Sequence, residues 1–138
     1  MNDNYQFSLE IAVRDYELDS EGIVNNAIYL HYLEMTRHAF CESVGYSFAQ
    51  MRADGLVPVV SRLEVDYRTP LRSGDVMLSR LRLASPRGPR FIFHQDIYNK
   101  ATGDVVIKAV VTIVAIENGR VSRGERFSQA LTRCASDE

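Results

Sequence analysis

The chain has 138 residues, which is room for one domain of ordinary size and not for a second. Its 46% hydrophobic and 25% charged residues are typical of a packed globular protein and exclude a disordered, collagen-like or coiled-coil chain. The net charge of −2 gives no general attraction to nucleic acid, which binds basic domains. We therefore expect a single domain over residues 1–138 that binds no nucleic acid.

The sequence gives no sign of a membrane segment or an export signal. It contains no run of about 18 to 20 apolar residues that could span a bilayer. Residues 1–4 lack the cationic and apolar regions of a signal peptide. Cys41 and Cys134 lie far apart and outside any CxxC motif, which favours free thiols over a disulfide or a zinc ribbon. These features predict a cytoplasmic protein without a membrane partner.

The first half of the chain predicts one strand and one long helix. Residues 5–13 alternate apolar and mostly polar side chains, as in a strand with one buried face. The acidic residues 14–22 are too polar to bury and predict a loop. A long helix is expected over residues 27–44, capped at its start by Asn25 or Asn26 and ended by the next glycine. Its apolar side chains form more than one stripe, so we expect neighbours to cover it on several sides.

The second half predicts a short helix and then mainly strands. Ser47 and Gln50 form a capping-box pattern, so a short helix should follow and end near Gly55. Strands are then expected at 59–67, 76–83, 90–98 and 105–116, a hairpin at 118–119, and at most a short helix at 125–131. Because the connecting turns are short, neighbouring strands should pair in antiparallel fashion.

Two details of these strands follow from the alternation of their side chains. Val59 and Tyr67 should share one face of their strand. The apolar positions change phase after Leu78, which predicts a bulge near Ser79 and Arg80. One sheet curled around the long helix would bury that helix, so the predicted fold is an α+β domain with an antiparallel sheet of about five strands around one central helix.

The strongest chemical feature is the acidic loop that enters the long helix. The first turn of a helix offers unpaired backbone N–H groups, which can polarise a carbonyl oxygen as it becomes an oxyanion. Asp19 is the best placed acid to lie on the other side of such a carbonyl, and Glu17 and Glu21 are comparably near in sequence. In the alternative interpretation, these acids only complement the helix dipole or solvate the loop.

A longer motif includes this loop. The chain reads Asp19-x-x-Gly22-x-Val24-x-Asn26-Ala27-x-Tyr29, preceded by Tyr16 and followed by Glu34 and Arg37. This pattern resembles the signature of hotdog-fold acyl-CoA thioesterases of the 4-hydroxybenzoyl-CoA thioesterase type. The resemblance continues through residues 56–60, 66–70 and 74–75, and so covers most of the chain.

The resemblance implies hydrolysis of an acyl-CoA thioester without a metal or another cofactor. In such enzymes the acid that matches Asp19 activates water or attacks the thioester, and the backbone N–H at the position of Asn26 polarises the carbonyl. Gly22, Val24 and Tyr29 belong to the same motif and are expected to contact the substrate. The residues do not specify the acyl group, or whether its carrier is CoA or acyl-carrier protein.

Two other functions stay open. Many relatives have histidine at the position of Asn26, so the role of that imidazole is not transferred to this chain. Asn25 also differs from the aromatic residue that is common at its position. A non-catalytic acyl-thioester binding protein would keep the cleft and tolerate this asparagine. A hotdog dehydratase is less favoured, because such enzymes resemble one another in using a histidine with an acidic partner, and the loop of Asp19 contains no histidine.

Seven arginines and only three acidic residues lie between Arg62 and Arg90. A compact anionic ligand could bind there, or the arginines could simply solvate strand edges. Guanidinium groups pair bidentately with phosphate, so we expect Arg87 and Arg90, which flank a Gly-Pro turn, to contact the phosphates of CoA. Arg68 and Arg72 are the next candidates.

Two other groups of polar residues on the long helix are not expected to be functional. His31, Glu34 and His38 share one helix face, but a zinc site needs further ligands and only His94 remains as another imidazole. Cys41 lies one turn from His38, yet no group that would orient the imidazole is evident. We therefore predict an inert core thiol rather than a nucleophile.

The predicted sheet also suggests association between copies of the chain. A curled sheet around one helix leaves edge strands with unpaired backbone groups, which a protein of this size must cover or pair. In the family that the chain resembles, two sheets join edge to edge, dimers often pair into tetramers, and the cleft lies between subunits. We therefore expect a homodimer or a homotetramer.

Overall fold

The described residues form one antiparallel sheet and three α-helices. The structure, a computed structural model, describes residues 4–85 and 87–136, without the side chains of residues 126 and 132–136. The strands are β1 (Phe7–Ala12), β2 (Leu56–Tyr67), β3 (Val76–Leu83), β4 (Arg90–Asn99), β5 (Val105–Glu117) and β6 (Arg120–Val121). The helices are α1 (Asn26–Ser43), α2 (Phe48–Ala53) and α3 (Glu125–Ser136), and a short 3-10 turn, η1, covers Asp15–Glu17.

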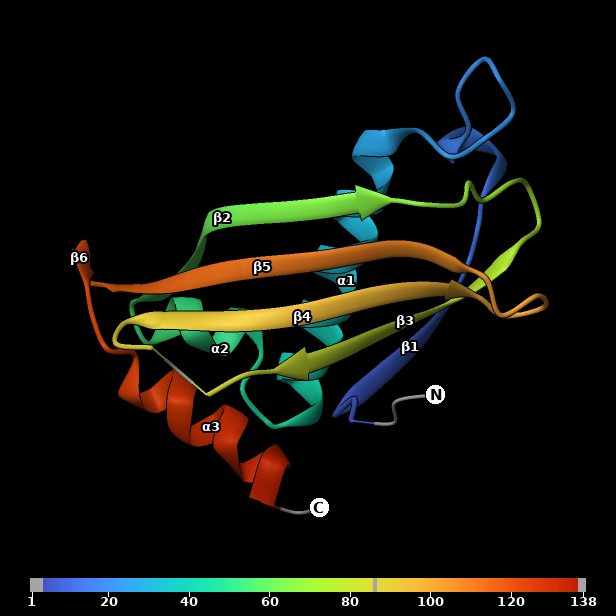
Figure 1. The fold of residues 1–138 in the computed structure, drawn as a ribbon. Coiled ribbons are helices and arrows are strands. Elements are labelled where there is room, and N and C mark those ends of the chain that lie inside the picture. The colour runs from blue at the N-terminus through green and yellow to red at the C-terminus, as the bar shows by residue number, and fades with distance from the viewer. Residues whose placement is uncertain (1–3, 86, 137–138) are drawn as a thin grey trace.

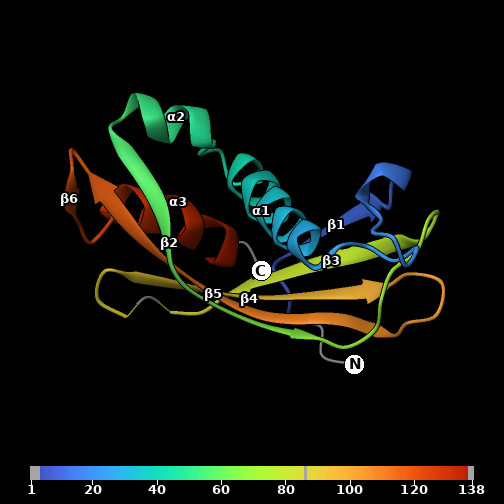
Figure 2. The same ribbon diagram turned by 90° about the horizontal axis from the view of Figure 1, so that it is seen from above.

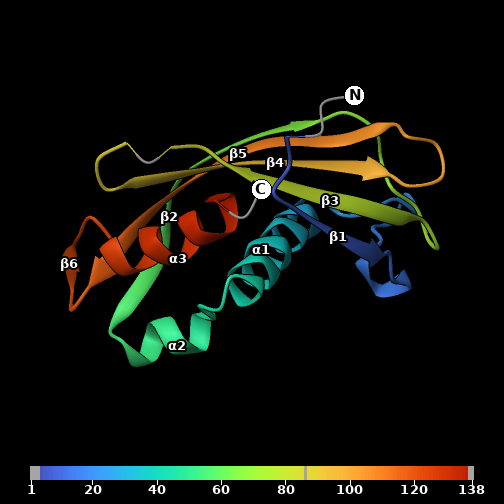
Figure 3. The same cartoon turned by 90° about the horizontal axis from the view of Figure 1, so that it is seen from below.

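The sheet curls around α1, as the sequence predicted (Figure 1). The strand order is β1-β3-β4-β5-β2, every neighbouring pair is antiparallel, and β6 extends the sheet beside β5. Views from above and below show the sheet bowed around α1, with α2 and α3 on the same side (Figure 2 and Figure 3). In the described part of the chain, every helix is too short or too polar to span a membrane.

The long helix begins and ends where local signals place it. Asn25 is the N-cap, and its side chain accepts a hydrogen bond from the Ala27 N–H at 2.9 Å. Gly45, with a φ of +85°, follows the helix end, where glycine adopts the left-handed conformation without strain. The expectation that α1 is covered on several sides is not met within one chain, because Leu30 and Met35 stay 37% and 46% exposed.

The edge strand β2 contains a β-bulge that the sequence did not reveal. Its register with β5 shifts between Val60 and Arg62. A bulge inserts one extra residue, so the side chains beyond it change face. Val59 pairs with a partly exposed residue of β5, whereas Tyr67 packs against Tyr29 on the side of α1. The prediction that Val59 and Tyr67 share one face is therefore wrong.

The predicted bulge in β3 is also wrong. Its register with both β1 and β4 is continuous, so Met77, Ser79 and Leu81 all face the core. A serine can occupy this buried position because its Oγ lies 2.6 Å from Oγ1 of Thr36 on α1, and a buried hydroxyl needs such a partner.

The C-terminal part agrees with the predicted hairpin and exceeds the predicted helix. Asn118 and Gly119, with φ of +51° and +82°, make the turn between β5 and β6. The helix α3 is longer than residues 125–131, and its Phe127 ring meets Phe91 of β4 edge to face at 4.7 Å. This packing places α3 at the end of the sheet where β4 begins (Figure 1).

Candidate functional site

Asp19 is held in a tight turn of the loop between β1 and α1. Its Oδ1 accepts hydrogen bonds from the backbone N–H of Glu21 at 2.8 Å and of Ile23 at 3.4 Å. Gly22 has a φ of +78°, a conformation that favours glycine, and so makes this turn possible. One carboxylate oxygen is thereby anchored. Among the described residues Oδ2 has no further hydrogen-bond partner, so it can meet a water molecule or a substrate.

The first turn of α1 has one backbone N–H to spare. The side chain and the carbonyl oxygen of Asn25 accept hydrogen bonds from Ala27 and Ile28, each at 2.9 Å. Within the described part of the chain, the N–H of Asn26 has no acceptor. An unpaired N–H at the positive end of a helix is suited to bind a developing negative charge on oxygen.

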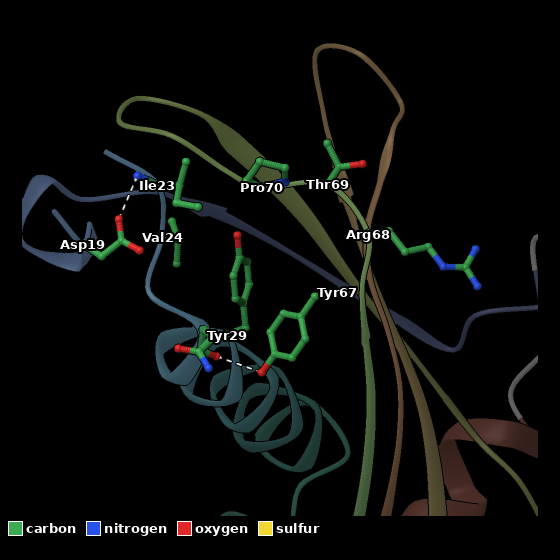
Figure 4. A pocket seen from close by; sticks show the side chains of 9 residues that line it. Asp19, Ile23, Val24, Tyr29, Tyr67, Arg68, Thr69 and Pro70 are labelled. Atoms are coloured by element: carbon green, nitrogen blue, oxygen red, sulfur yellow. Dashed lines mark hydrogen bonds between the residues drawn. The ribbon is translucent and has the colours of Figure 1, made fainter. Parts of the chain in front are cut away.

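Asp19 and Asn26 line the same pocket, which has a volume of about 390 Å³ (Figure 4). This volume is in the range of small-molecule sites. Most of the remaining lining is apolar or aromatic. The lining residues are Asp19, Ile23, Val24, Asn26, Tyr29, Tyr67, Arg68, Thr69 and Pro70. The pocket thus combines one carboxylate, one free helical N–H and an apolar wall.

Two tyrosines form part of that wall. The rings of Tyr29 and Tyr67 meet edge to face with their centroids 5.7 Å apart. The Tyr29 hydroxyl accepts a hydrogen bond from the Leu71 N–H at 3.0 Å, and burial raises the pKa of this hydroxyl, so it stays neutral. The Tyr67 hydroxyl donates to the carbonyl oxygen of Asn26 at 3.0 Å. The wall is therefore fixed to the helix and to the β2–β3 connection.

The three other acids of the loop, Asp15, Glu17 and Glu21, do not line the pocket. Glu17 is engaged elsewhere, since its Oε1 accepts hydrogen bonds from the Tyr32 hydroxyl at 2.8 Å and the Arg14 N–H at 2.9 Å. Glu21 is exposed to solvent. Asp19 is therefore the carboxylate that the structure brings to Asn26.

The structure brings only some of the predicted site residues together. Val24 and Tyr29 line the pocket, whereas Gly22 makes the turn without lining it. Arg87 in the β3–β4 turn and Arg90 at the start of β4 are both exposed. This turn lies at the opposite end of the sheet from the loop between β1 and α1 (Figure 1). Within one chain these two arginines therefore do not reach the pocket.

Sequence reasoning missed the wall contributed by the end of β2. Tyr67, Thr69 and Pro70 belong to it, together with Arg68, which the sequence offered only as an alternative phosphate contact. The Val24 N–H donates to the Leu71 carbonyl oxygen at 2.9 Å and so joins two segments that lie far apart in sequence. The motif resemblance extends over residues 66–70, which was the available signal, but a pattern within one segment does not reveal its partner.

Two further candidate groups on α1, His38 and Cys41, do not form a reactive pair. His38 stacks on Phe48, with ring centroids 4.4 Å apart, and its Nε2 lies 3.2 Å from Glu42 Oε1. Cys41 is buried and free, and burial raises the pKa of its thiol to about 12. A thiol with such a pKa stays protonated at neutral pH and is a poor nucleophile. Cys41 is thus a free thiol in the core, as predicted, and its lack of reactivity stays a prediction; the side chain of Cys134 lies outside the described residues.

Comparison with known proteins identifies the class. The family model of the thioesterase-like superfamily matches residues 13–133, so the chain belongs to this superfamily. Its curled sheet around α1 is the hotdog fold, as the sequence motif implied. The solved structure of a hypothetical protein from Aquifex aeolicus is similar at a TM-score of 0.85 and 28% identity, covering 91% of this chain and 98% of that one.

Two of the similar proteins are named thioesterases. The long-chain acyl-CoA thioesterase FadM of Escherichia coli is 35% identical over 108 residues, which cover 78% of this chain and 81% of the relative. A chloroplastic acyl-acyl carrier protein thioesterase of Arabidopsis thaliana is 34% identical over 110 residues, or 80% of this chain. The match spans only 58% of the length of that relative.

Proposed function

We propose that the protein is a thioester hydrolase that converts an acyl-CoA and water into a free acid and CoA. The proposal rests on one observation. In a member of the thioesterase-like superfamily, the carboxylate of Asp19 and the unpaired N–H of Asn26 belong to one pocket at the start of α1. These are the two groups that thioester hydrolysis requires, a base or nucleophile and an oxyanion donor.

In the general-base form of the reaction, Asp19 takes a proton from water as the water oxygen attacks the thioester carbonyl carbon. The carbonyl oxygen becomes an oxyanion, and the N–H of Asn26 donates to it. When the carbon–sulfur bond breaks, the proton on Asp19 passes to the departing thiolate, which leaves as a thiol. The anchored Oδ1 holds the carboxylate in place while Oδ2 reacts.

In the nucleophilic form, Asp19 attacks the carbonyl carbon itself and expels the thiolate. The resulting mixed anhydride is then hydrolysed by water, which restores the carboxylate. The oxyanion donor serves both forms, so the geometry of Asn26 supports the reaction without selecting between them. Water labelled with oxygen-18 distinguishes them, because in a single turnover only the nucleophilic form can place the label in the carboxylate of Asp19.

The names of the relatives suggest which acyl carriers and acyl groups to propose for this protein. FadM is named for long-chain acyl-CoA and the Arabidopsis protein for acyl-acyl carrier protein, so both carriers belong in a substrate screen. The pocket lining includes no histidine among its described residues, which disfavours the dehydratase alternative. We also propose a cytoplasmic location, with which the free thiol of Cys41 is compatible.

We further propose that the protein works as a homodimer or homotetramer. The long strand β2 lies at the edge of the sheet and carries exposed apolar side chains, namely Val57, Val59, Val60, Leu63 and Tyr67. On α1, Leu30 and Met35 are exposed as well. An exposed edge strand with apolar side chains is a site where another chain can pair. The described pocket includes residues from the end of β2, so a second copy on this edge would border it.

The substitution Asp19→Asn tests the proposed hydrolysis. Asparagine keeps the side-chain oxygen that accepts from the loop N–H groups but removes the base, so we expect a folded protein that has lost at least about 10²-fold in turnover. The assay measures free thiol released from octanoyl-CoA, palmitoyl-CoA, benzoyl-CoA and palmitoyl-acyl carrier protein. Glu21→Gln, an exposed acid of the same loop, is the matched control and should keep wild-type turnover.

Two results would count against the proposal. Near wild-type turnover in Asp19→Asn would remove Asp19 from the reaction. Tight binding of these acyl thioesters to the wild-type protein without release of thiol would instead identify a non-catalytic binding protein.

A further inference from the structure

Tyr67 contacts the residue that supplies the unpaired N–H. It is the last residue of β2 and 49% exposed, yet its hydroxyl is directed at the helix, where it donates to the carbonyl oxygen of Asn26 at 3.0 Å (Figure 4). Its ring lies edge to face against Tyr29. The residue that Tyr67 holds is therefore the same residue whose N–H is unpaired.

The fold does not need this hydrogen bond to begin the helix. Asn25 already caps α1, and the Val24 and Leu71 backbones tie the loop to the β2–β3 connection at 2.9 Å. The carbonyl of Asn26 can accept a bond inside the helix as well, because a carbonyl oxygen has two lone pairs. The bond from Tyr67 is thus an additional restraint on the first turn, made from the opposite wall of the pocket.

An oxyanion donor is effective only when it is held in position before the reaction. A displacement of about 1 Å in a reacting geometry can cost up to about 10²-fold in rate. The other N–H groups of the first turn, those of Ala27 and Ile28, are committed to Asn25, so the position of Asn26 alone decides where the free donor points.

We infer that Tyr67 is a positioning residue of the proposed thioesterase site, whose hydroxyl fixes Asn26 so that the Asn26 N–H meets the thioester carbonyl oxygen. This inference rests on the proposed function. Tyr67 lines the pocket and belongs to the edge strand β2, so the same side chain joins the sheet edge to the helix that supplies the donor.

The substitution Tyr67→Phe tests the inference because it removes only the hydroxyl and keeps the ring against Tyr29. With the best acyl-CoA of the screen, we expect kcat to fall about 10-fold while KM and the melting temperature stay unchanged, since the lost contact acts in the transition state. Hydrogen exchange of the backbone over residues 24–29, followed by mass spectrometry, should become faster. Tyr67→Met also lacks the hydroxyl and should lose kcat as well.

The matched control is Tyr98→Phe, which removes a tyrosine hydroxyl on β4 that lies 2.8 Å from the Tyr5 hydroxyl, away from the pocket. It should keep wild-type kcat. Wild-type kcat in both Tyr67 variants, alongside an inactive Asp19→Asn, would overturn the positioning role and leave the proposed function standing. Absence of thiol release by the wild-type protein would overturn the proposed function itself.

Discussion

At the scale of single residues, two acids that the sequence offered as candidates for the reacting carboxylate have different surroundings. Asp19 and Glu17 lie two positions apart in one polar loop. Glu17 Oε1 is bonded to a buried tyrosine, Tyr32, and to a backbone N–H, and so ties the loop to α1. Asp19 lines the pocket and uses one oxygen for its own turn, and its other oxygen has no hydrogen-bond partner among the described residues. The difference depends on the three-dimensional position of the loop, which spacing does not contain.

We expect His94, on the outer face of the sheet, to make stability depend on pH. Burial lowers the pKa of His94, and the neighbouring charge of Arg82 lowers it further, against the opposite effect of Asp96. In the unfolded chain the imidazole keeps its ordinary pKa of about 6.5. Below that pH the unfolded state binds more protons than the folded state, so stability falls as the pH drops towards the lower, folded pKa.

We therefore expect the melting temperature to fall as the pH is lowered from about 7 to about 5. It should fall less steeply in His94→Gln, because glutamine does not bind a proton in this range. Differential scanning fluorimetry across this range measures the two slopes. His31→Gln, an exposed histidine of α1, is the control and should keep the wild-type slope. An identical slope in His94→Gln would show that His94 does not contribute.

At the scale of elements, local signals predicted what is locally determined. The cap of α1 at Asn25, the N-cap of α2 at Ser47 and the turn at Asn118 act through neighbouring residues, and all three are confirmed. The Gln50 side chain does not complete the predicted capping box, because it donates to Asp54 at 3.1 Å. The phase of two strands was wrong, because a bulge in β2 and a buried hydroxyl pair at Ser79 depend on elements distant in sequence. Local pattern fixed the element types, and tertiary contacts decided which faces are buried.

The site was predictable to a similar extent. The motif around Asp19 and Asn26 lies on one continuous segment, so the sequence located the loop and the helix start together. The wall formed by Tyr67 lies about forty residues away along the chain, and only the folded structure joins it to Asn26, with the hydrogen bond spanning 41 positions. A single sequence contains no direct sign of such a contact.

The edge strand yields a prediction about association. Leu63 on β2 and Met35 on α1 are 40% and 46% exposed, and we expect a second copy to cover them. Multi-angle light scattering at micromolar concentration should give at least twice the mass of one chain. Introducing a charge with Leu63→Glu plus Met35→Glu should shift the mass to that of the monomer, because burying these carboxylates in an apolar interface is unfavourable.

The control for this experiment is Val121→Glu. Val121 is also apolar and 61% exposed, but it lies on β6, away from the β2 edge. It should leave the mass of the oligomer unchanged. A wild-type protein of monomer mass under these conditions would contradict the proposed association.

At the scale of the whole molecule, pairing between copies changes which residues can share a site. If β2 pairs with its own copy around a two-fold axis, the strands run antiparallel, so the Leu56 end of one copy lies beside the Tyr67 end of the other. Arg90 lies in the same cross-strand row as Val59, near the Leu56 end. The β3–β4 turn of one copy would then lie at the same end of the joined sheet as the other copy's pocket. Within one chain, this turn and the pocket are far apart.

This arrangement keeps Arg87 and Arg90 as proposed contacts for the phosphates of CoA, supplied to the pocket of the neighbouring copy. Phosphate contacts bind the ground state and the transition state alike, so Arg87→Ala plus Arg90→Ala should raise KM for acyl-CoA roughly tenfold, equivalent to about 1.4 kcal/mol, and leave kcat nearly unchanged. The matching acyl-pantetheine, which has no nucleotide phosphates, should show no change in KM. Arg120→Ala, on exposed β6, is the control. Equal losses on both substrates, or a loss confined to kcat, would move the phosphate contact elsewhere, and Arg68, which already lines the pocket, would be the next candidate.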